Sequence, residues 1–561
     1  MTPSTAGTTR ARAAVAARAF SFLFVLVAAA RIAATYHVFS QTFDEPAHVA
    51  TGLEWLDRGS YQLEAQHPPV ARVAVALGPY LAGARLTGRG NMWEEGNAAL
   101  FDSGERSVRS YVHTLTLARL GVLPFFLGLA LVVWLWTRRL WGEWAAAAAV
   151  ALLTLTPTVL AHAGLATTDV PATATLLALI YGFTRWLERL GEPGGDRRSV
   201  WVLGTLGALA LLTKFSSLLF FPAAALPIAA AWWAAGHNAL PPARAKAAAG
   251  RGAVLALLAA VPLVWAAYRF STGRALGVPT IAPELLKGIQ EVALHNQGGH
   301  RAYILGLTST DGWWWFFPAA LAVKAPIAML LLGVGGAAAS LAWARRARDW
   351  RPAAPALAAL AILGVSMTAR INIGVRHVLV VFPLLAMTGA YAALRLWRAG
   401  VAGRAAVALL GLWLAVASAR AHPDYLPYFN EFAAAHPERV LLDSDLDWGQ
   451  DLLRLAEVAR ARRIDRLALI YSGSANTRRV GLPAGHRCLR ARDRATGWVA
   501  VSENVLRRGM FGERLTWLEP YEASSERVGA SIRLFYIPPG SVVETPVEDP
   551  RPVTMSCHGV F

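Results

Sequence analysis

The sequence predicts an all-α polytopic membrane protein that ends in a small α/β domain. Of its 561 residues, 55% are hydrophobic and only 16% are charged, with a mean hydropathy of +0.39, a composition too apolar for a soluble protein. The apolar residues form blocks of roughly 17 to 25 residues, the length of a helix that crosses a bilayer. After Arg420 the apolar runs shorten and polar residues return. We therefore expect a transmembrane domain over residues 1–420 and an extracytoplasmic α/β domain over residues 421–561.

About eleven apolar blocks are long enough to be transmembrane helices. Arginines precede the first block, and no small-residue cleavage site lies before Phe43, so this block is interpreted as an uncleaved span and not as a signal peptide. The stretch from 201 to 235 is divided into two short spans at Lys214. The expected spans are 18–38, 115–136, 144–162, 170–187, 201–214, 217–235, 252–270, 313–340, 353–369, 377–397 and 404–420.

The basic residues set the expected orientation. The 54 basic and 36 acidic residues give a formal net charge of +18, which in a soluble protein would suggest nucleic-acid binding. Here the arginines and lysines cluster in every second connection between apolar blocks, as they do in cytoplasmic loops. With a cytoplasmic N-terminus, all of these loops are cytoplasmic and the first connection, about 39–114, is a long outer loop. The expected partner is the lipid bilayer, and no nucleic acid is expected.

An acidic patch follows the first span. Thr42 and Glu45 have the Ser/Thr-x-x-Glu spacing of a capping box, so a helix is expected here, with Asp44 in its first turn and His48 one turn further on the same face. The acids could simply be solvated residues that cap this helix. Because they adjoin a membrane face and other outward polar clusters, we interpret Asp44 as a general base toward an acceptor hydroxyl. Glu45 is the second acid of this site and also caps the helix.

Two more outward-facing residues are candidates for the same site. His67 precedes Pro68 and Pro69, where it is either a simple turn residue or a side chain that the rigid prolines hold to orient a substrate group. Asp169 lies where the third span returns into the fourth, so it is expected to cap the fourth helix. An acid at a membrane boundary is also a functional candidate, and Asp169 faces the same side as Asp44.

A basic hairpin between the ninth and tenth spans faces outward, against the usual charge bias. This exception suggests an anionic ligand, most simply a phosphate or pyrophosphate. Lys214 and Lys324 lie in or near spans, where they either extend to the interface or bind the same phosphate. The polar residues of the hairpin are Arg370, Asn372, Arg376 and His377.

The sequence assigns no metal site. Asp443, Asp445 and Asp447 alternate as calcium ligands do, but the loop lacks the glycine at its sixth position and a clear glutamate about twelve residues on. Together with Asp451 they are interpreted as caps of the following helix, and a divalent cation is the one cofactor that the sequence leaves open. It contains no Walker loop, dinucleotide-binding glycine motif in context, zinc-ligand spacing or nucleophile elbow.

The last part of the chain has the pattern of a small α/β domain. An amphipathic helix is expected over Leu452–Arg463, and buried strands over Leu467–Tyr471, Trp498–Ser502 and Ile532–Ile537. The two cysteines of the chain, Cys488 and Cys557, lie in this region. Outside the cytoplasm they could form a disulfide, and two unpaired thiols are the equal alternative.

The order of these motifs resembles that of the protein O-mannosyltransferase family (glycosyltransferase family 39) and its bacterial relatives, which include the lipid A aminoarabinose transferases. The resemblance rests on Asp44 and Glu45, followed by His48 and then by the His67-Pro-Pro motif in one outer loop. The C-terminal domain is not the set of sugar-binding repeats of eukaryotic mannosyltransferases, so the acceptor stays open. Four later segments are similar to bacterial members: Ala166–Asp169, Val323–Pro326, Arg370–His377 and Asp443–Asp451.

The resemblance implies an inverting glycosyltransferase of the C superfold in the bacterial inner (plasma) membrane, with a polyprenyl-phosphate sugar as its donor on the outer face. Asp44 matches the family's catalytic acid, and Asp169 matches the second-loop acid of the bacterial relatives. Asp44 would take the acceptor proton. The charge of the leaving lipid phosphate would be stabilised by Arg376, His377 or Lys324.

Two other functional classes are weighed. A transporter or flippase of lipid-linked sugars predicts polar residues at mid-membrane depth and often repeat symmetry, and neither is clear in the sequence. A membrane-anchored binding protein would use its outer domain as the working part. The sugar, the acceptor and the lipid chain length are not predicted.

Overall fold

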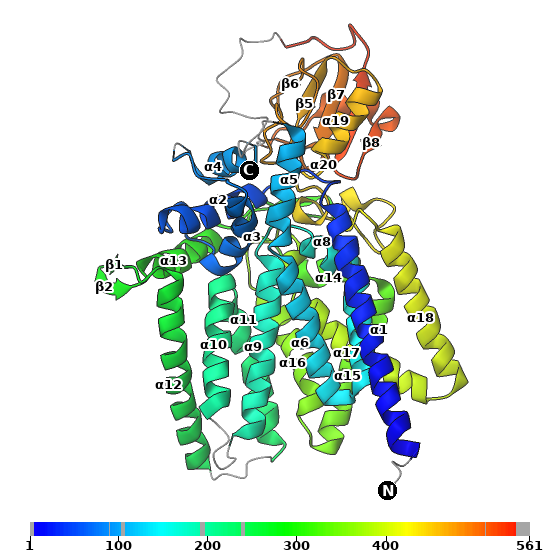
Figure 1. Cartoon of the computed structure of the whole chain (residues 1–561). Coiled ribbons are helices and arrows are strands. Elements are labelled where there is room, and N and C mark those ends of the chain that lie inside the picture. Colours follow the sequence, from blue (N-terminus) through cyan, green and yellow to red (C-terminus); the bar gives the residue numbers. More distant parts are fainter. Residues whose placement is uncertain are drawn as a thin grey trace.

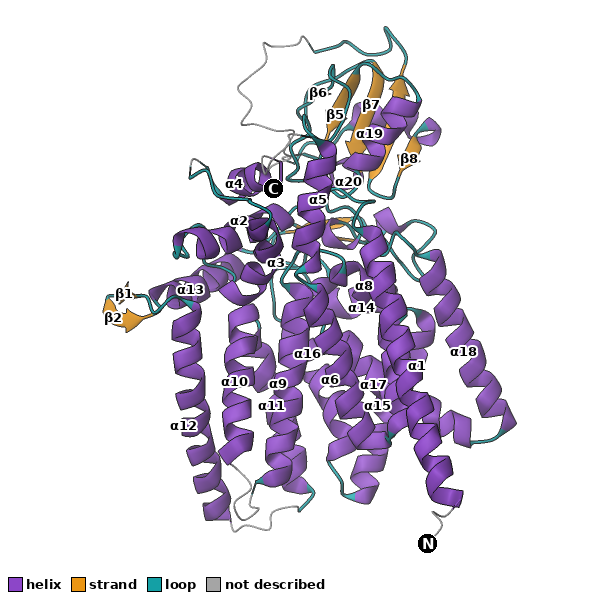
Figure 2. Cartoon of the chain, viewed as in Figure 1, coloured by secondary structure: helices purple, strands orange, loops and turns teal. Residues whose placement is uncertain are grey.

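The computed structural model describes residues 5–88, 90–101, 107–190, 197–236, 242–510 and 512–545. Its helices form an elongated bundle, and a small domain that contains a β-sheet stands at one end of it (Figure 1). In the described residues, strands occur in this domain and in two short hairpins (Figure 2). The chain starts at the opposite end of the bundle, and α1 runs from there toward the sheet domain.

The bundle helices overlap the expected apolar blocks, some of which are divided between two helices, because a long apolar segment in a bilayer satisfies its backbone hydrogen bonds as a helix. Six of the described helices are long and apolar enough to cross a membrane, or seven if the bent pair α7–α8 counts as one span. The bundle helices are α1 (Thr5–Thr35), α5 (Val108–Leu120), α6 (Leu123–Trp141), α7 (Glu143–Thr154), α8 (Pro157–Ala163), α9 (Asp169–Arg189), α10 (Arg197–Thr213), α11 (Ser217–Ala234), α12 (Pro242–Ala267), α14 (Phe316–Lys324), α15 (Ile327–Ala347), α16 (Ala354–Ser366), α17 (Val381–Arg398) and α18 (Val401–Arg420).

Breaks between helices shape the end of the bundle that carries the sheet domain. Helices α7 and α8 meet at an angle of 70°, and α8 begins at Pro157, which has no N–H to continue the α7 ladder. The block expected at 313–340 is not a single span, since α14 ends at Lys324 and α15 follows Pro326. The expected division of the 201–235 stretch is confirmed, because Lys214 lies between α10 and α11.

The first outer loop folds into short helices across this end of the bundle (Figure 1). Helix α2 begins at Glu45 with Asp44 as its N-cap residue, and the backbone N–H of Thr42 donates to Glu45 Oε2 at 2.7 Å. The helix thus begins two residues later than the capping-box spacing predicts, because Asp44 and not Thr42 is its N-cap residue. The elements of the loop are α2 (Glu45–Leu53), the π-helical turn η1 (Glu54–Arg58), α3 (Pro69–Leu81) and α4 (Met92–Phe101).

The outer connection between α12 and α14 carries two antiparallel hairpins and one helix. Helix α13 lies between the hairpins in the chain and extends along the same end of the bundle (Figure 1). The elements of this connection are β1 (Thr272–Ala275), β2 (Val278–Ile281), α13 (Pro283–Gly298), β3 (Ala302–Ile304) and β4 (Leu307–Ser309).

The C-terminal domain contains a five-stranded sheet of order β6-β5-β7-β9-β8. Strand β5 pairs in parallel with β6 and β7, whereas β9 pairs antiparallel with β7 and β8. The expected strands are confirmed as β5 (Leu467–Ile470), β7 (Gly497–Ser502) and β9 (Ile532–Ile537), and the expected helix as α19 (Leu452–Ala461). The remaining elements, too short for a clear apolar pattern, are β6 (Arg487–Cys488), α20 (Glu503–Arg508) and β8 (Glu526–Val528).

Short helical turns complete the fold. The turn η3 precedes α17 and carries the end of the outward basic hairpin, while η5 lies in the aspartate-rich segment. Their bounds are η2 (Arg351–Ala353), η3 (Val375–Val378), η4 (Pro437–Arg439), η5 (Asp443–Asp445) and η6 (Thr516–Ser524).

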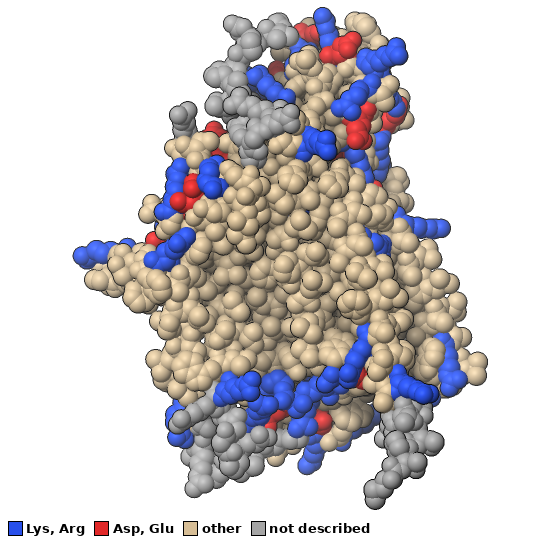
Figure 3. All heavy atoms as spheres, in the orientation of Figure 1, with Lys and Arg blue, Asp and Glu red and all other residues tan. Residues whose placement is uncertain are grey.

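Charged side chains divide the visible surface into zones (Figure 3). Lysines and arginines gather at the end of the bundle far from the sheet domain, and the zone between the two ends is almost free of charged side chains. An apolar belt bounded on one side by basic residues is typical of a polytopic membrane protein. The chain is therefore a multi-span membrane protein.

Candidate active site

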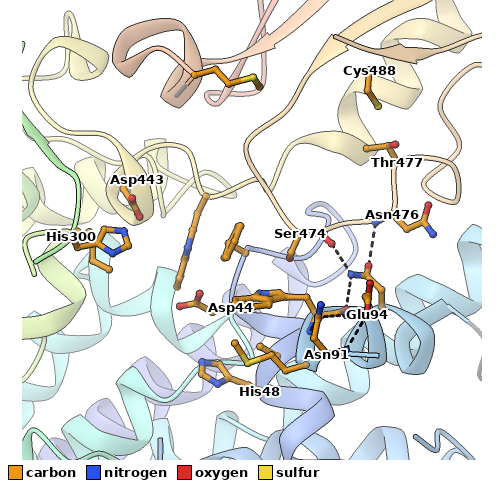
Figure 4. A pocket seen from close by; sticks show the side chains of 18 of the residues that line it. Asp44, His48, Asn91, Glu94, His300, Asp443, Ser474, Asn476, Thr477 and Cys488 are labelled. Atoms are coloured by element: carbon orange, nitrogen blue, oxygen red, sulfur yellow. Dashed lines mark hydrogen bonds between the residues drawn. The ribbon is translucent and has the colours of Figure 1, made fainter. Parts of the chain in front are cut away.

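A cavity of about 2770 Å³ lies between the first outer loop, the neighbouring helix ends and the C-terminal domain. Figure 4 shows Asp44 and His48 from the first outer loop below Ser474 and Asn476 from the C-terminal domain. The cavity thus brings together the outward-facing segments that the sequence analysis singled out.

Four charged residues, here called the central cluster, meet at this cavity: Asp44, Asp169, Lys214 and Arg376. Arg376 Nη1 donates to Asp44 Oδ2 at 2.9 Å and lies 3.7 Å from Asp169 Oδ2. Lys214 Nζ donates to Asp169 Oδ1 at 2.6 Å. The Asp169 side chain is fully buried, whereas that of Asp44 is 27% exposed. Asp44 is therefore the carboxylate of the cluster that a substrate in the cavity can reach.

Arg376 is held in place by the segment that follows η5. Its Nε donates to Ser444 Oγ at 3.1 Å, and its guanidinium carbon lies 4.2 Å from the centre of the Trp448 ring. The backbone N–H of Val375 donates to the Asp445 carboxylate at 3.1 Å. Ser444 and Trp448 could not be found from the sequence, because no local pattern shows that they pack against a distant hairpin.

Glu45 does not line the cavity, and its expected catalytic role stays a prediction. Arg119 donates to its two oxygens, from Nε at 2.8 Å and from Nη2 at 2.9 Å. The backbone N–H groups of Thr42 and Ala166 donate to the same carboxylate at 2.7 and 2.8 Å. Arg119 also donates to three backbone carbonyls, those of Tyr36, Phe39 and Ser40.

We call Glu45 and Arg119, with the backbone groups that they bind, the loop anchor. It ties the first outer loop to the loop before Asp169, because Glu45 binds the N–H of Ala166. Arg119 was missed in the sequence, although a charged residue inside the expected span 115–136 was a usable signal.

His48 and His67 lie together in the cavity wall, with their ring centres 5.2 Å apart. Arg72 Nε donates to His48 Nδ1 at 3.2 Å, and its guanidinium pairs with Glu64. Burial and this Arg72 charge hold the pKa of His48 well below its usual range. Burial and the Lys214 ammonium lower the pKa of His67 to about 4. Both rings are therefore neutral near pH 7 and offer hydrogen bonds rather than positive charge.

His377 also lines the cavity, next to Arg376. Its Nε2 is buried and has no hydrogen-bond partner among the described residues. Burial, together with the Lys214 and Arg376 charges, holds the pKa of His377 well below its usual range. A neutral imidazole with one unused nitrogen can bind a polar substrate atom.

The other two polar residues of the hairpin do not line the cavity. Arg370 pairs with Asp311 and donates to the carbonyl of Gln297 at 2.8 Å. Asn372 is buried and accepts a hydrogen bond from the backbone N–H of Trp313 at 2.6 Å. Both residues brace the hairpin against the outer connection, and their expected role in substrate binding stays a prediction.

Lys324 is likewise not a cavity residue. Its ammonium donates to the backbone carbonyls of Leu426 and Asp445, each at 2.7 Å, and lies 4.4 Å from the centre of the Phe429 ring. All of these contacts are inside the protein, since Lys324 is only 1% exposed. The expected contact of Lys324 with a phosphate is therefore not supported, and Lys214 is the lysine at the cavity.

The aspartates after η5 bind backbone groups. Asp447 accepts from the N–H of Asn504 at 2.8 Å, and Asp451 accepts from the N–H and hydroxyl of Ser531 at 3.0 and 2.8 Å. Asp451 is the N-cap residue of α19, but its side chain makes no capping bond there. The carboxylate instead binds Ser531, directly before β9. Within the described ranges, no group of three or more His, Cys, Asp or Glu side chains could hold a metal ion.

Cys488 ends β6 and lines the cavity. Cys557 lies outside the described residues, so its pairing with Cys488 stays a prediction.

The cavity has two chemically different walls. Toward the bundle it is lined by apolar side chains of α11 and α13, among them Leu218, Leu219 and Val292. Leu218 and Leu219 are about half exposed, at 48% and 51%, so this wall continues onto the apolar outside of the bundle. Toward the C-terminal domain the lining is basic and aromatic, with Arg466, Arg478, Trp498 and Tyr536.

A family model of known proteins matches part of the chain. Residues 21–276, which include Asp44, Asp169 and Lys214, match the family model of dolichyl-phosphate-mannose-protein mannosyltransferase. No curated protein matches the chain. The resemblance noted in the sequence is thus confirmed over residues 21–276. The chain is a membrane glycosyltransferase similar to the protein mannosyltransferases.

Three solved structures are similar to the chain. ArnT from Cupriavidus metallidurans bound to undecaprenyl phosphate is 14% identical, with 93% of this chain and 99% of that chain covered and a TM-score of 0.47. The oligosaccharyltransferase AglB from Archaeoglobus fulgidus, in complex with an inhibitory peptide and a dolichol-phosphate, is 12% identical, with coverages of 86% and 69% and a TM-score of 0.48. The apo form of the Archaeoglobus fulgidus oligosaccharyltransferase is 14% identical, with coverages of 72% and 55% and a TM-score of 0.47.

Proposed function

We propose that this protein transfers a sugar from a polyprenyl-phosphate-linked donor to a hydroxyl of a protein, glycan or lipid acceptor, with Asp44 as the general base. The observation that carries the proposal is the central cluster, in which Arg376 joins a reachable carboxylate, Asp44, to a buried one, Asp169. The family that matches residues 21–276 is described by a donor of this kind, a dolichyl-phosphate sugar.

The two walls of the cavity suit the two parts of such a donor. An isoprenoid chain packs against the apolar wall formed by α11 and α13, which continues onto the outside of the bundle. Its phosphate then reaches the charged groups at the cavity, Lys214 and Arg376, and the unused nitrogen of His377. The acceptor enters from the side of the C-terminal domain.

The reaction is a single displacement at the anomeric carbon. The acceptor oxygen attacks this carbon, the bond from the carbon to the phosphate oxygen breaks, and the configuration is inverted. Asp44 takes the acceptor proton, and the polyprenyl phosphate leaves with the electron pair of the broken bond. Arg376 and Lys214 stabilise the negative charge that this phosphate gains.

Asp44 and Asp169 have different parts in this scheme. Asp169 is fully buried and bound by Lys214, so it positions both cations and stays ionised. Asp44 is partly exposed, and its one cationic partner in the central cluster is Arg376, which also lies near Asp169. A donor phosphate competes with Asp44 for this guanidinium, because phosphate also forms paired, charge-assisted hydrogen bonds with arginine. Donor binding therefore frees the base.

The test is transfer by the purified full chain and its Asp44→Asn variant. The substrate is radiolabelled polyprenyl-phosphate mannose, and an envelope extract supplies the acceptor. General-base catalysis contributes about 10²- to 10⁴-fold, so the variant is expected to lose that much activity while it still binds the donor. Asp57→Asn, in the same loop but outside the cavity, is the matched control and keeps full activity. Undiminished transfer by Asp44→Asn removes Asp44 as the base.

The same assay separates the enzyme from a transporter. A transferase breaks the bond between sugar and lipid and releases free polyprenyl phosphate in step with labelled product. A flippase in sealed vesicles moves the label across the membrane but leaves this bond intact.

We also propose that the protein lies in the bacterial inner membrane with its N-terminus in the cytoplasm and the domain over residues 421–561 outside. The basic end of the bundle far from the sheet domain supports this orientation (Figure 3). A cysteine at Gln62, in a variant with both native cysteines replaced by serine, is expected to react with a membrane-impermeant thiol reagent in spheroplasts. A cysteine at Arg346 should react only after lysis, and the reverse result overturns the orientation.

A further inference from the structure

A second cavity, of about 850 Å³, lies at the opposite end of the bundle from the central cluster. It is formed where four helices, α6, α9, α15 and α17, reach their C-terminal ends beside η2. This is the end at which lysines and arginines gather on the surface (Figure 3). Nothing in the proposed transfer reaction uses it.

The charges in this cavity are not balanced. Its two acids are both engaged by arginines: Glu188 accepts from Arg139 at 2.7 Å, and Asp349 lies 3.8 Å from Arg351. Two more arginines at the cavity, Arg395 and Arg398 in the last turn of α17, are exposed and have no carboxylate partner among the described residues. Arg395 Nη1 instead donates to the hydroxyl of Tyr391 at 3.3 Å. The cavity therefore presents two cations to whatever occupies it.

Aromatic side chains form the rest of the wall. Trp141 and Tyr391 stack with their ring centres 4.9 Å apart, and Trp343, also in the lining, is 39% exposed. Tryptophan and tyrosine are typical of the depth at which lipid headgroups lie. The general bias toward basic residues on one face explains the sign of the charge here, but it does not account for a hollow lined by aromatic rings.

We propose that this cavity binds the phosphate of an anionic phospholipid headgroup, with Arg395 and Arg398 as donors and the rings of Trp343 and Trp141 against the glycerol and upper acyl chain. Basic pockets between transmembrane helices hold such headgroups elsewhere. Arginine suits the site, because its planar fork forms paired hydrogen bonds with phosphate oxygens.

The experiment measures binding of short-chain phosphatidylglycerol to the full chain in neutral detergent by native mass spectrometry, with phosphatidylcholine as the zwitterionic competitor of zero net charge. Each basic residue near a membrane surface contributes about 1 kcal/mol to the attraction of an anionic lipid, so the double variant Arg395→Gln/Arg398→Gln is expected to bind phosphatidylglycerol about thirtyfold more weakly. Phosphatidylcholine binding should not change. Arg395→Lys/Arg398→Lys, which keeps the charge, should recover most of the affinity.

The matched control is Arg345→Gln/Arg346→Gln, which removes two exposed arginines from the same end of the bundle but outside the cavity. Its affinity is expected to stay within about twofold of the unmodified chain. An equal loss in the control, or no loss in the cavity variant, overturns the proposal. An arm with inorganic phosphate separates the two sources of the ligand: failure to compete at millimolar concentration supports a lipid headgroup, and full competition overturns it in favour of a free anion. Equal size-exclusion profiles exclude unfolding as the cause.

Discussion

The central cluster and the loop anchor contain neighbouring acids of the chain, Asp44 and Glu45, and each acid is paired with an arginine. In the loop anchor, Arg119 and two backbone N–H groups use the Glu45 carboxylate completely, and nothing in it is exposed. In the central cluster, Asp44 shares one guanidinium and remains partly exposed to the cavity.

An acid–arginine pair is therefore not by itself a sign of a catalytic site. The buried pair of Glu45 and Arg119 fixes two loops. The partly exposed pair of Asp44 and Arg376, here called the open pair, offers a carboxylate and a cation to a substrate. In the proposed reaction, the partners that the fold gives each of the two adjacent acids decide which of them acts as the base.

A substitution that breaks the loop anchor should change the stability of the protein most. Glu45→Gln leaves Arg119 buried without a counter-charge, which should cost about 3–5 kcal/mol of folding free energy. We expect a clear fall in the apparent Tm and in the yield of folded protein. Glu457→Gln, on the exposed face of α19, is the control and should change little. If Glu45→Gln instead keeps its Tm but loses transfer activity, the assignment of a structural role to Glu45 and a catalytic role to Asp44 is wrong.

A change at Arg376 tests the open pair. Arg376→Lys keeps the charge but loses the fork that reaches Asp44, Asp169 and Ser444 together. We expect kcat/KM for the donor to fall about 10- to 100-fold, with a smaller change in Tm than in Glu45→Gln. Steady-state rates over a range of donor concentrations give this ratio. A variant as active as the unmodified chain would contradict the role of the guanidinium.

The two lysines once expected to bind phosphate should now behave differently. Lys214→Met removes a cation at the cavity and should raise the donor KM about tenfold. Lys324→Met should leave KM within about twofold but lower stability by about 1–3 kcal/mol, because the carbonyls of Leu426 and Asp445 lose their donor. Equal effects of both changes on KM would show that Lys324 also senses the donor.

The smallest effect concerns the neutral histidines. In the unfolded chain His67 takes up a proton near its ordinary pKa of about 6.5, whereas in the folded protein its pKa is about 4. Between these values the unfolded state binds more protons, so the stability is fully present above pH 6.5 and declines as the pH falls toward 4. His67→Gln should flatten this part of a plot of Tm against pH. An unchanged slope would show that the ring is not neutral in the fold.

The helices and the grouping of site residues at one end of the bundle could be predicted from the sequence because both depend on local signals. Block length gives the spans, and the alternation of basic loops places Asp44, Asp169 and Arg376 on one side. Whether a lysine reaches a cavity or a carbonyl depends on contacts between segments that are distant in the chain, so Lys214 and Lys324 looked equivalent. Trp448 was missed for the same reason.

The two walls of the cavity have a consequence for the order of events in turnover. In the proposed reaction the lipid donor would arrive along the apolar wall beside α11 and the acceptor from the side of the C-terminal domain, so that neither blocks the path of the other. Both must be present together for a single displacement. We therefore expect sequential kinetics of random order, in which double-reciprocal plots intersect and the spent lipid and the glycosylated product leave independently.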